Sequence, residues 1–135
     1  ITETVRLIGI DAPELGDCFA SQATRILRQQ LFNHTIWIAE GDEPRDPYGR
    51  LLAYVFQDDG TFVNLEMVKA GAATAERVSP NVDYANLIGT AHDEAYIAQR
   101  GGWREMLIVL ATTKQQRWKI QYPVNPRALN KGDIK

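Results

Sequence analysis

The chain has 135 residues, of which 44% are hydrophobic and 24% charged, and its formal net charge is −2. These values fit one folded domain and exclude a disordered, collagen-like or low-complexity chain. The longest apolar run has six residues, too few to cross a bilayer, and the single cysteine, Cys18, excludes an internal disulfide. Because the chain begins at Ile1 without Met or a signal peptide, we expect a processed, trimmed or partial protein.

The charges are unevenly distributed along the chain. Residues 1–99 hold seven basic and fifteen acidic side chains, whereas residues 100–135 hold eight basic and two acidic ones. The basic segment is either a solvated tail that aids solubility or a segment that holds a polyanion near an acidic body.

Hydrophobic periodicity and turn residues predict four strands and three helices. In chain order these are strand 4–10, helix 19–33, strand 35–39, a charged loop over 40–47, strand 50–56, a hairpin turn at 58–60 leading into strand 61–63, a helix that Asn64 caps and that ends before Gly71, and helix 83–100. This order predicts an α+β fold with a mostly antiparallel sheet.

The first charged segment surrounds the end of the first strand. Arg6 lies within that strand, and Asp11 and Glu14 flank the kink that Pro13 imposes. Two carboxylates on one rim, with backbone carbonyls of a kinked loop, are ligands that a calcium ion prefers. The alternative is that Asp11 caps the turn and Glu14 is solvated.

The second charged segment, residues 45–50, precedes a buried strand. Its Arg50 and the Arg6 of the first segment both lie at strand ends, so both guanidinium groups could reach one phosphate. Two arginines, two carboxylates and no histidine motif suit metal-assisted hydrolysis of a phosphodiester. The alternative is weak surface ion pairs, for example between Arg50 and Asp46.

Three other reactive side chains carry weaker signals. His34 and His92 lack the spacing of metal or catalytic motifs, so we expect them at helix ends or on the surface. Cys18 is expected to pack beside Phe19 rather than to act as a nucleophile.

Both charged segments, in this order, resemble the staphylococcal nuclease family. Residues 5–14, VRLIGIDAPE, are similar to its "VRLxGIDxPE" block, and residues 46–55, DPYGRLLAYV, to its "DxYGRxLAYV" block. Residues 63–71 resemble its "VNxxLVxxG" segment, and helix 83–100 with Gly101-Gly102-Trp103 resembles its last helix and "GLW" end. The agreement covers about residues 4–104.

The resemblance implies roles for individual residues. Arg6 and Arg50 match the arginines that contact the scissile phosphate, and Glu14 matches the general base or water-positioning acid. Asp11 and the backbone carbonyl of Ala12 match two calcium ligands. The expected reaction is calcium-dependent endonucleolytic cleavage of DNA and RNA. We also expect Tyr48 and Arg77 to contact the substrate, and the resemblance implies a secreted or extracytoplasmic location.

The implied fold is an OB-type five-stranded barrel with three helices, formed by a nuclease-like domain over residues 1–104 and followed by a basic extension, residues 105–135, packed on it. The family has two strands before the strand of Arg6, and they carry a further calcium-binding aspartate. Only five residues precede Arg6 here, none of them Asp, so we expect a weak calcium site. Residues 76–80 also lack the tyrosines that contact the nucleotide in the type member.

Two hypotheses extend beyond these matches. A non-catalytic nuclease-like module that binds nucleic acid or protein, as in Tudor-containing proteins, is the alternative function, because the calcium aspartate is missing. Within residues 106–124, Trp118, Ile120, Tyr122 and Val124 alternate as in a strand with one buried face. This segment is therefore expected to replace the first two strands, within one chain or by strand exchange in a homodimer. Alternatively, the two missing strands belong to a longer native protein. We expect no membrane partner.

Overall fold

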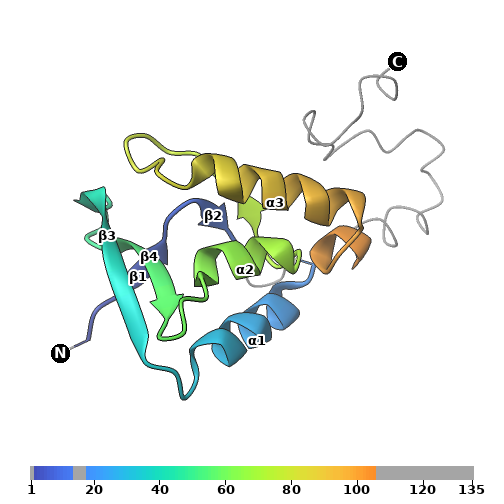
Figure 1. Cartoon of the computed structure of the whole chain (residues 1–135), viewed down its shortest axis with the longest axis horizontal. Coiled ribbons are helices and arrows are strands. Elements are labelled where there is room, and N and C mark those ends of the chain that lie inside the picture. The colour runs from blue at the N-terminus through green and yellow to red at the C-terminus, as the bar shows by residue number, and fades with distance from the viewer. Residues whose placement is uncertain (1, 14–17, 106–135) are drawn as a thin grey trace.

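The computed structural model describes residues 2–13 and 18–105 (Figure 1). In chain order its elements are β1 (Val5–Leu7), β2 (Ile10–Asp11), α1 (Ala20–Leu31), β3 (Ile36–Arg45), β4 (Leu51–Gln57), α2 (Val63–Lys69), β5 (Thr74–Ala75) and α3 (Ala85–Ile97). The prediction of an α+β fold with mostly antiparallel pairing is confirmed, because only β1 and β4 pair in parallel.

The strands form two sheets rather than one. The larger sheet has the order β1-β4-β3, and the smaller sheet pairs β2 with β5. Within the described residues the two sheets do not close into a barrel, and β1 and β3 are the outer strands of the larger sheet. The closed five-stranded barrel therefore remains an expectation. Residues 106–124, for which we expect the barrel-filling role, lie outside the described residues.

The predicted strand 4–10 is in fact two short strands. Ile8 and Gly9 form a turn between β1 and β2, and Gly9 adopts a φ of 85°, which glycine tolerates better than other residues. Apolar periodicity alone does not reveal this break, since Ile8 and Ile10 are both buried in the core. The turn redirects the chain between Arg6 and Asp11.

The predicted charged loop over 40–47 is also wrong in part. β3 continues to Arg45, with an irregularity in its pairing to β4 between Glu40 and Arg45. The amide of Asn81 holds this stretch, accepting from the Glu43 N–H at 2.9 Å and donating to the Glu43 carbonyl at 2.9 Å. The side chain of Asn81 thus stabilises an extended backbone that the polar sequence of residues 40–45 does not predict.

The start of α2 differs from the prediction as well. Phe62 is the N-cap residue and makes no side-chain capping bond, while Asn64 lies inside the helix. In place of the predicted strand 61–63, a single bridge joins Phe62 to Phe56. Asn64 is fully buried and bonds to two other segments, which is why it does not cap the helix.

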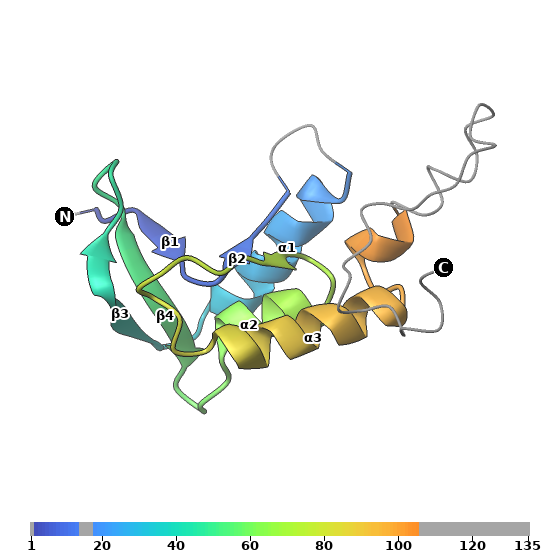
Figure 2. The same cartoon turned by 90° about the horizontal axis from the view of Figure 1, so that it is seen from above.

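The helices gather at one end of the molecule and the larger sheet at the other (Figures 1 and 2). α2 packs against α1, α3 and β4 and so stands at the centre of the fold. Its Val63, Met67 and Val68 are almost completely buried, together with Ile10 and Ile88. None of the helices within residues 2–13 and 18–105 has the length and apolar character needed to cross a membrane.

Candidate active site

Arg6 is fixed by the turn that follows its own strand. Its Nη1 donates to the Leu7 carbonyl at 3.0 Å and to the Ile10 carbonyl at 2.7 Å. The guanidinium therefore spans the turn at Ile8 and Gly9. The side chain is 26% exposed, so a solvent-borne anion can reach it.

Two carboxylates lie near the other terminal nitrogen of Arg6. Glu76 Oε1 accepts from Nη2 at 2.9 Å, and Asp11 Oδ1 lies 3.8 Å from the same atom. The Asp11 side chain is 61% exposed, and its backbone carbonyl accepts a 3.3 Å hydrogen bond from the Thr74 hydroxyl. The free protein thus surrounds this nitrogen with negative charge.

Arg50 is held by the turn that precedes β4. The Asp46 carboxylate accepts from the Arg50 Nε at 2.6 Å, from the Arg50 N–H at 2.8 Å and from the Tyr48 N–H at 2.9 Å. Partial burial would raise the pKa of the Asp46 carboxyl, but these hydrogen bonds and the Arg50 charge bring it below its ordinary value. The pair is more than a loose surface contact, since Asp46 also binds two backbone N–H groups.

Arg6 lies in β1, and Arg50 lies immediately before β4, the strand that pairs with β1. β1 runs parallel to β4, with Arg6 opposite Leu52, and Arg50 precedes Leu52 by two positions. Arg50 is 40% exposed, and its Cζ lies 5.7 Å from the centre of the highly exposed Tyr48 ring.

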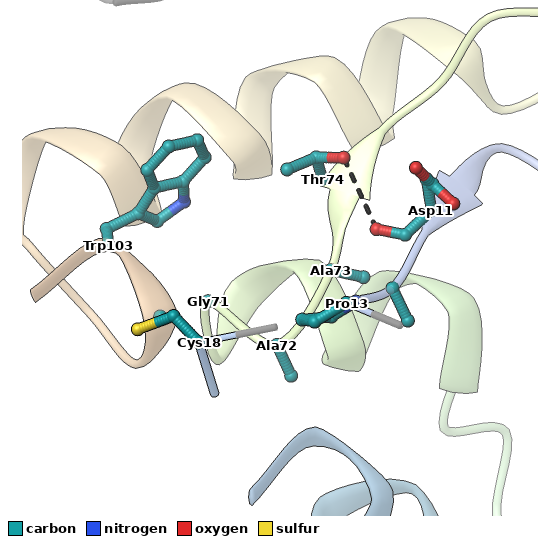
Figure 3. A pocket seen from close by; sticks show the side chains of 10 residues that line it. Asp11, Pro13, Cys18, Gly71, Ala72, Ala73, Thr74 and Trp103 are labelled. Carbon is teal, nitrogen blue, oxygen red and sulfur yellow. Dashed lines mark hydrogen bonds between the residues drawn. The ribbon is translucent and has the colours of Figure 1, made fainter. Parts of the chain in front are cut away.

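A pocket of about 400 Å³ adjoins Asp11 but does not include either arginine. Its wall contains Asp11, Pro13, Cys18, Thr74 and Trp103, as Figure 3 shows. Cys18 is exposed here instead of being packed away, which corrects our expectation. Among the described residues, the lining of the pocket is mostly apolar and holds no Lys or Arg side chain.

Three further residues were predicted to belong to the site: Glu14, Arg77 and Ala12. Glu14 lies outside the described residues. Arg77 is exposed immediately after Glu76, and Ala12 is exposed beside Asp11. Within residues 2–13 and 18–105, no three His, Cys, Asp or Glu side chains are arranged to hold a metal ion.

Comparison with known proteins identifies the family. The model described as "Staphylococcal nuclease homologue" matches residues 4–105, well over half of the chain. The chain belongs to the staphylococcal nuclease family.

Several named nucleases are similar in sequence to this chain. A thermonuclease of Staphylococcus intermedius is 36% identical over 107 residues, covering 75% of this chain and 63% of that protein. An uncharacterized endonuclease of Escherichia coli is 32% identical over 101 residues, with the same coverage of 75% and 63%. Endonuclease YhcR of Bacillus subtilis is 32% identical over 118 residues, which is 77% of this chain but 10% of that protein. The chain thus spans 63% of the length of the first two relatives.

Sequence reasoning missed two residues that shape this nuclease-family site. Glu76 is 70 positions from its partner Arg6, and no local pattern indicates the pair. His92, expected at a helix end or on the surface, is buried within α3. Its Nδ1 accepts from the Ala75 N–H at 3.0 Å, and its ring packs edge-on against Trp103. This bond ties β5, and with it the backbone next to Glu76, to α3. Hydrophobic periodicity does not predict the burial of this lone histidine in α3.

Proposed function

We propose that the protein is a phosphodiesterase that cleaves nucleic acid by attack of water on phosphorus. The observation that supports this proposal is the pairing of β1, which holds Arg6, with β4, which Arg50 immediately precedes, together with the partial exposure of both guanidinium groups. Two such groups can bind the two free oxygens of one phosphodiester and stabilise the added charge of its transition state. The names of the nuclease relatives support the same reaction class.

The proposed roles follow from what each side chain offers. Arg6 and Arg50 bind and neutralise the phosphate, and Glu14 holds or deprotonates the attacking water. Tyr48, highly exposed beside Arg50, offers a ring on which a base can stack, and Arg77 offers a charge to the backbone of the nucleic acid. The OB-type barrel over residues 1–104, with the basic segment 105–135 packed on it, is the arrangement that we propose around this site.

Calcium is the metal that we propose. Asp11 and the Ala12 carbonyl would hold it, and the ion would supply positive charge next to the phosphate. The exposure of Asp11 fits a largely hydrated ion. Arg6, 3.8 Å from Asp11, adds a competing positive charge. Weak binding of calcium follows.

The alternative is a module of the same family that binds nucleic acid or protein without cleaving it. The weak calcium binding that we propose favours this non-catalytic module. Against it stands the Asp46 carboxylate, whose three hydrogen bonds fix the Arg50 side chain and its turn. Such fixation of a phosphate-binding group suits catalysis, where positioning lowers the barrier, more than it suits loose binding.

A cleavage assay on a labelled single-stranded oligonucleotide tests the proposal. We expect cleavage to rise with calcium over roughly 0.1–1 mM or above, as for weak sites with few protein ligands, and to stop with a chelator. Arg6→Ala should lower turnover by about 100-fold or more, as loss of a donor to a developing charge does. Glu14→Gln should lower it by a similar factor while binding of the oligonucleotide persists.

Arg25→Ala is the matched control, because Arg25 is an exposed arginine of α1 that takes no part in the proposed site. Its turnover should equal that of the unmodified protein. Cleavage that survives the chelator, or that survives Arg6→Ala, would contradict the proposal. Binding without cleavage at any calcium concentration would establish the non-catalytic module instead.

A further inference from the structure

Glu76 competes with any phosphate that approaches Arg6. The Nη1 of Arg6 is occupied by two backbone carbonyls, so Nη2 is the terminal nitrogen that faces other charged groups. Glu76 already occupies that nitrogen at 2.9 Å, with Asp11 next at 3.8 Å. A phosphate oxygen that binds Nη2 must therefore displace the Glu76 carboxylate or share the nitrogen with it.

The backbone holds Glu76 in this place. The Glu76 N–H donates to the Gly9 carbonyl at 2.8 Å, which extends the pairing of β2 with β5 by one step. The Glu76 side chain is 44% exposed and that of Arg6 26% exposed, so their ion pair is solvated and weak enough to be broken. After displacement, the carboxylate remains tethered beside the phosphate site by its own backbone.

We propose that Glu76 makes the site favour phosphodiesters over terminal phosphates and so promotes release of the cleaved product. The proposal rests on the proposed function and adds a residue that determines specificity for the same reaction. A phosphodiester carries one negative charge. Its hydrolysis leaves a phosphomonoester, which carries close to two charges at pH 7 because its second pKa is about 6.

A tethered carboxylate repels the monoester more strongly than the diester. One additional unit charge about 4 Å away in a water-like dielectric corresponds to about a fivefold change in a dissociation constant. Glu76 thus weakens binding of substrate somewhat and binding of product more. An uncharged side chain at this position would remove that difference.

Competition binding in the presence of a chelator tests the proposal without turnover. A fluorescent single-stranded oligonucleotide is displaced by a thymidine dinucleotide, whose single phosphate is a diester, or by thymidine 3′-monophosphate. We expect Glu76→Gln to tighten binding of the monophosphate, relative to the dinucleotide, by about fivefold at pH 7.5. At pH 5 the monophosphate carries one charge, and the variant should then tighten both competitors equally.

Glu66→Gln is the matched control, since Glu66 is a carboxylate of α2 that pairs with Lys69 at 3.3 Å and not with Arg6. It should leave the relative affinities unchanged at both pH values. A double variant, Arg6→Ala with Glu76→Gln, should show the same relative affinities as Arg6→Ala alone. In turnover, Glu76→Gln should lower the inhibition constant of thymidine 3′-monophosphate, relative to that of the thymidine dinucleotide, by about the same fivefold factor.

The inference is overturned if Glu76→Gln leaves the relative affinities at pH 7.5 unchanged, or if Glu66→Gln alters them as much. That failure is distinct from failure of the proposed function. An Arg6→Ala protein that still cleaves the oligonucleotide would refute the phosphodiesterase mechanism whatever the competitors show. Loss of cleavage in Arg6→Ala, with no effect of Glu76→Gln on competition, would refute only the role of Glu76.

Discussion

At the scale of single residues, the side chain of Asn64 joins α2 to β4 and to the turn that follows β1. Its Oδ1 accepts from the Val55 N–H at 2.9 Å, and its Nδ2 donates to the Ile8 carbonyl at 2.8 Å and to the Ala53 carbonyl at 3.3 Å. Ile8 belongs to the turn that Arg6 spans. A buried amide in α2 therefore positions the backbone of the candidate site.

We expect Asn64→Ala to lower the free energy of unfolding by about 2–4 kcal/mol, because the substitution leaves buried backbone groups without partners. Urea unfolding followed by circular dichroism measures the change. Asn86→Ala, at an exposed position of α3, should stay within about 0.5 kcal/mol of the unmodified protein. Equal stability of the two variants would contradict the role of Asn64.

At the scale of elements, the ends of α2 and α3 meet through two glycines. Gly71 and Gly101 adopt φ values of 72° and 53°, and the Gly102 N–H donates to the Gly71 carbonyl at 2.9 Å. A Cβ on Gly71 would collide with the Arg100 carbonyl, and one on Gly101 with the Ala70 carbonyl. The chain segments that follow α2 and α3 are therefore in backbone contact, with no room for a Cβ atom at Gly71 or Gly101.

Gly71→Ala should destabilise the protein by at least about 2 kcal/mol more than Gly60→Ala. Both positions have positive φ, so both substitutions strain the backbone, but a Cβ on Gly60 would meet open space. Thermal and urea unfolding of the two variants isolate the cost of the collision. Similar losses at both positions would show that the backbone conformation, and not the close approach, requires glycine.

At the scale of the whole molecule, the larger sheet ends on two strands that have no outer partner among the described residues. These strands are β1 and β3, and the exposed fractions are 36% for Val5, 64% for Trp37 and 49% for Ile38. Unpaired strand edges with exposed apolar side chains favour association with other chains. Residues 106–124, which we propose as the cover of these edges, lie outside the described residues.

We expect a chain that lacks residues 105–135 to self-associate at micromolar concentrations, because its strand edges and exposed apolar side chains would lose their cover. Analytical ultracentrifugation of the full and shortened chains measures the difference. A shortened chain that stays soluble, monomeric and cooperatively folded would show that residues 105–135 do not cover these edges. A full chain that is dimeric would favour strand exchange between two copies.

The family, the α+β class and the two blocks that carry the arginines could all be predicted from the amino-acid sequence alone. These features are local: strand and helix periodicity, the glycine and proline turns, and motifs of ten residues all lie within one stretch of chain. The pairing of Arg50 with Asp46 is of this kind, since only four positions separate them. The ion pair between Arg50 and Asp46 could therefore be predicted from the sequence as an alternative to phosphate binding.

Contacts between residues far apart in the sequence could be identified only from the tertiary structure. The Arg6–Glu76 pair, the three bonds of Asn64 and the bond from Ala75 to His92 depend on how β1 pairs with β4 and β2 with β5. Register and close approach arise from packing of the whole core, and hydrophobic periodicity does not encode them. The carboxylate of Glu76 could therefore be assigned to Arg6 only from the folded molecule.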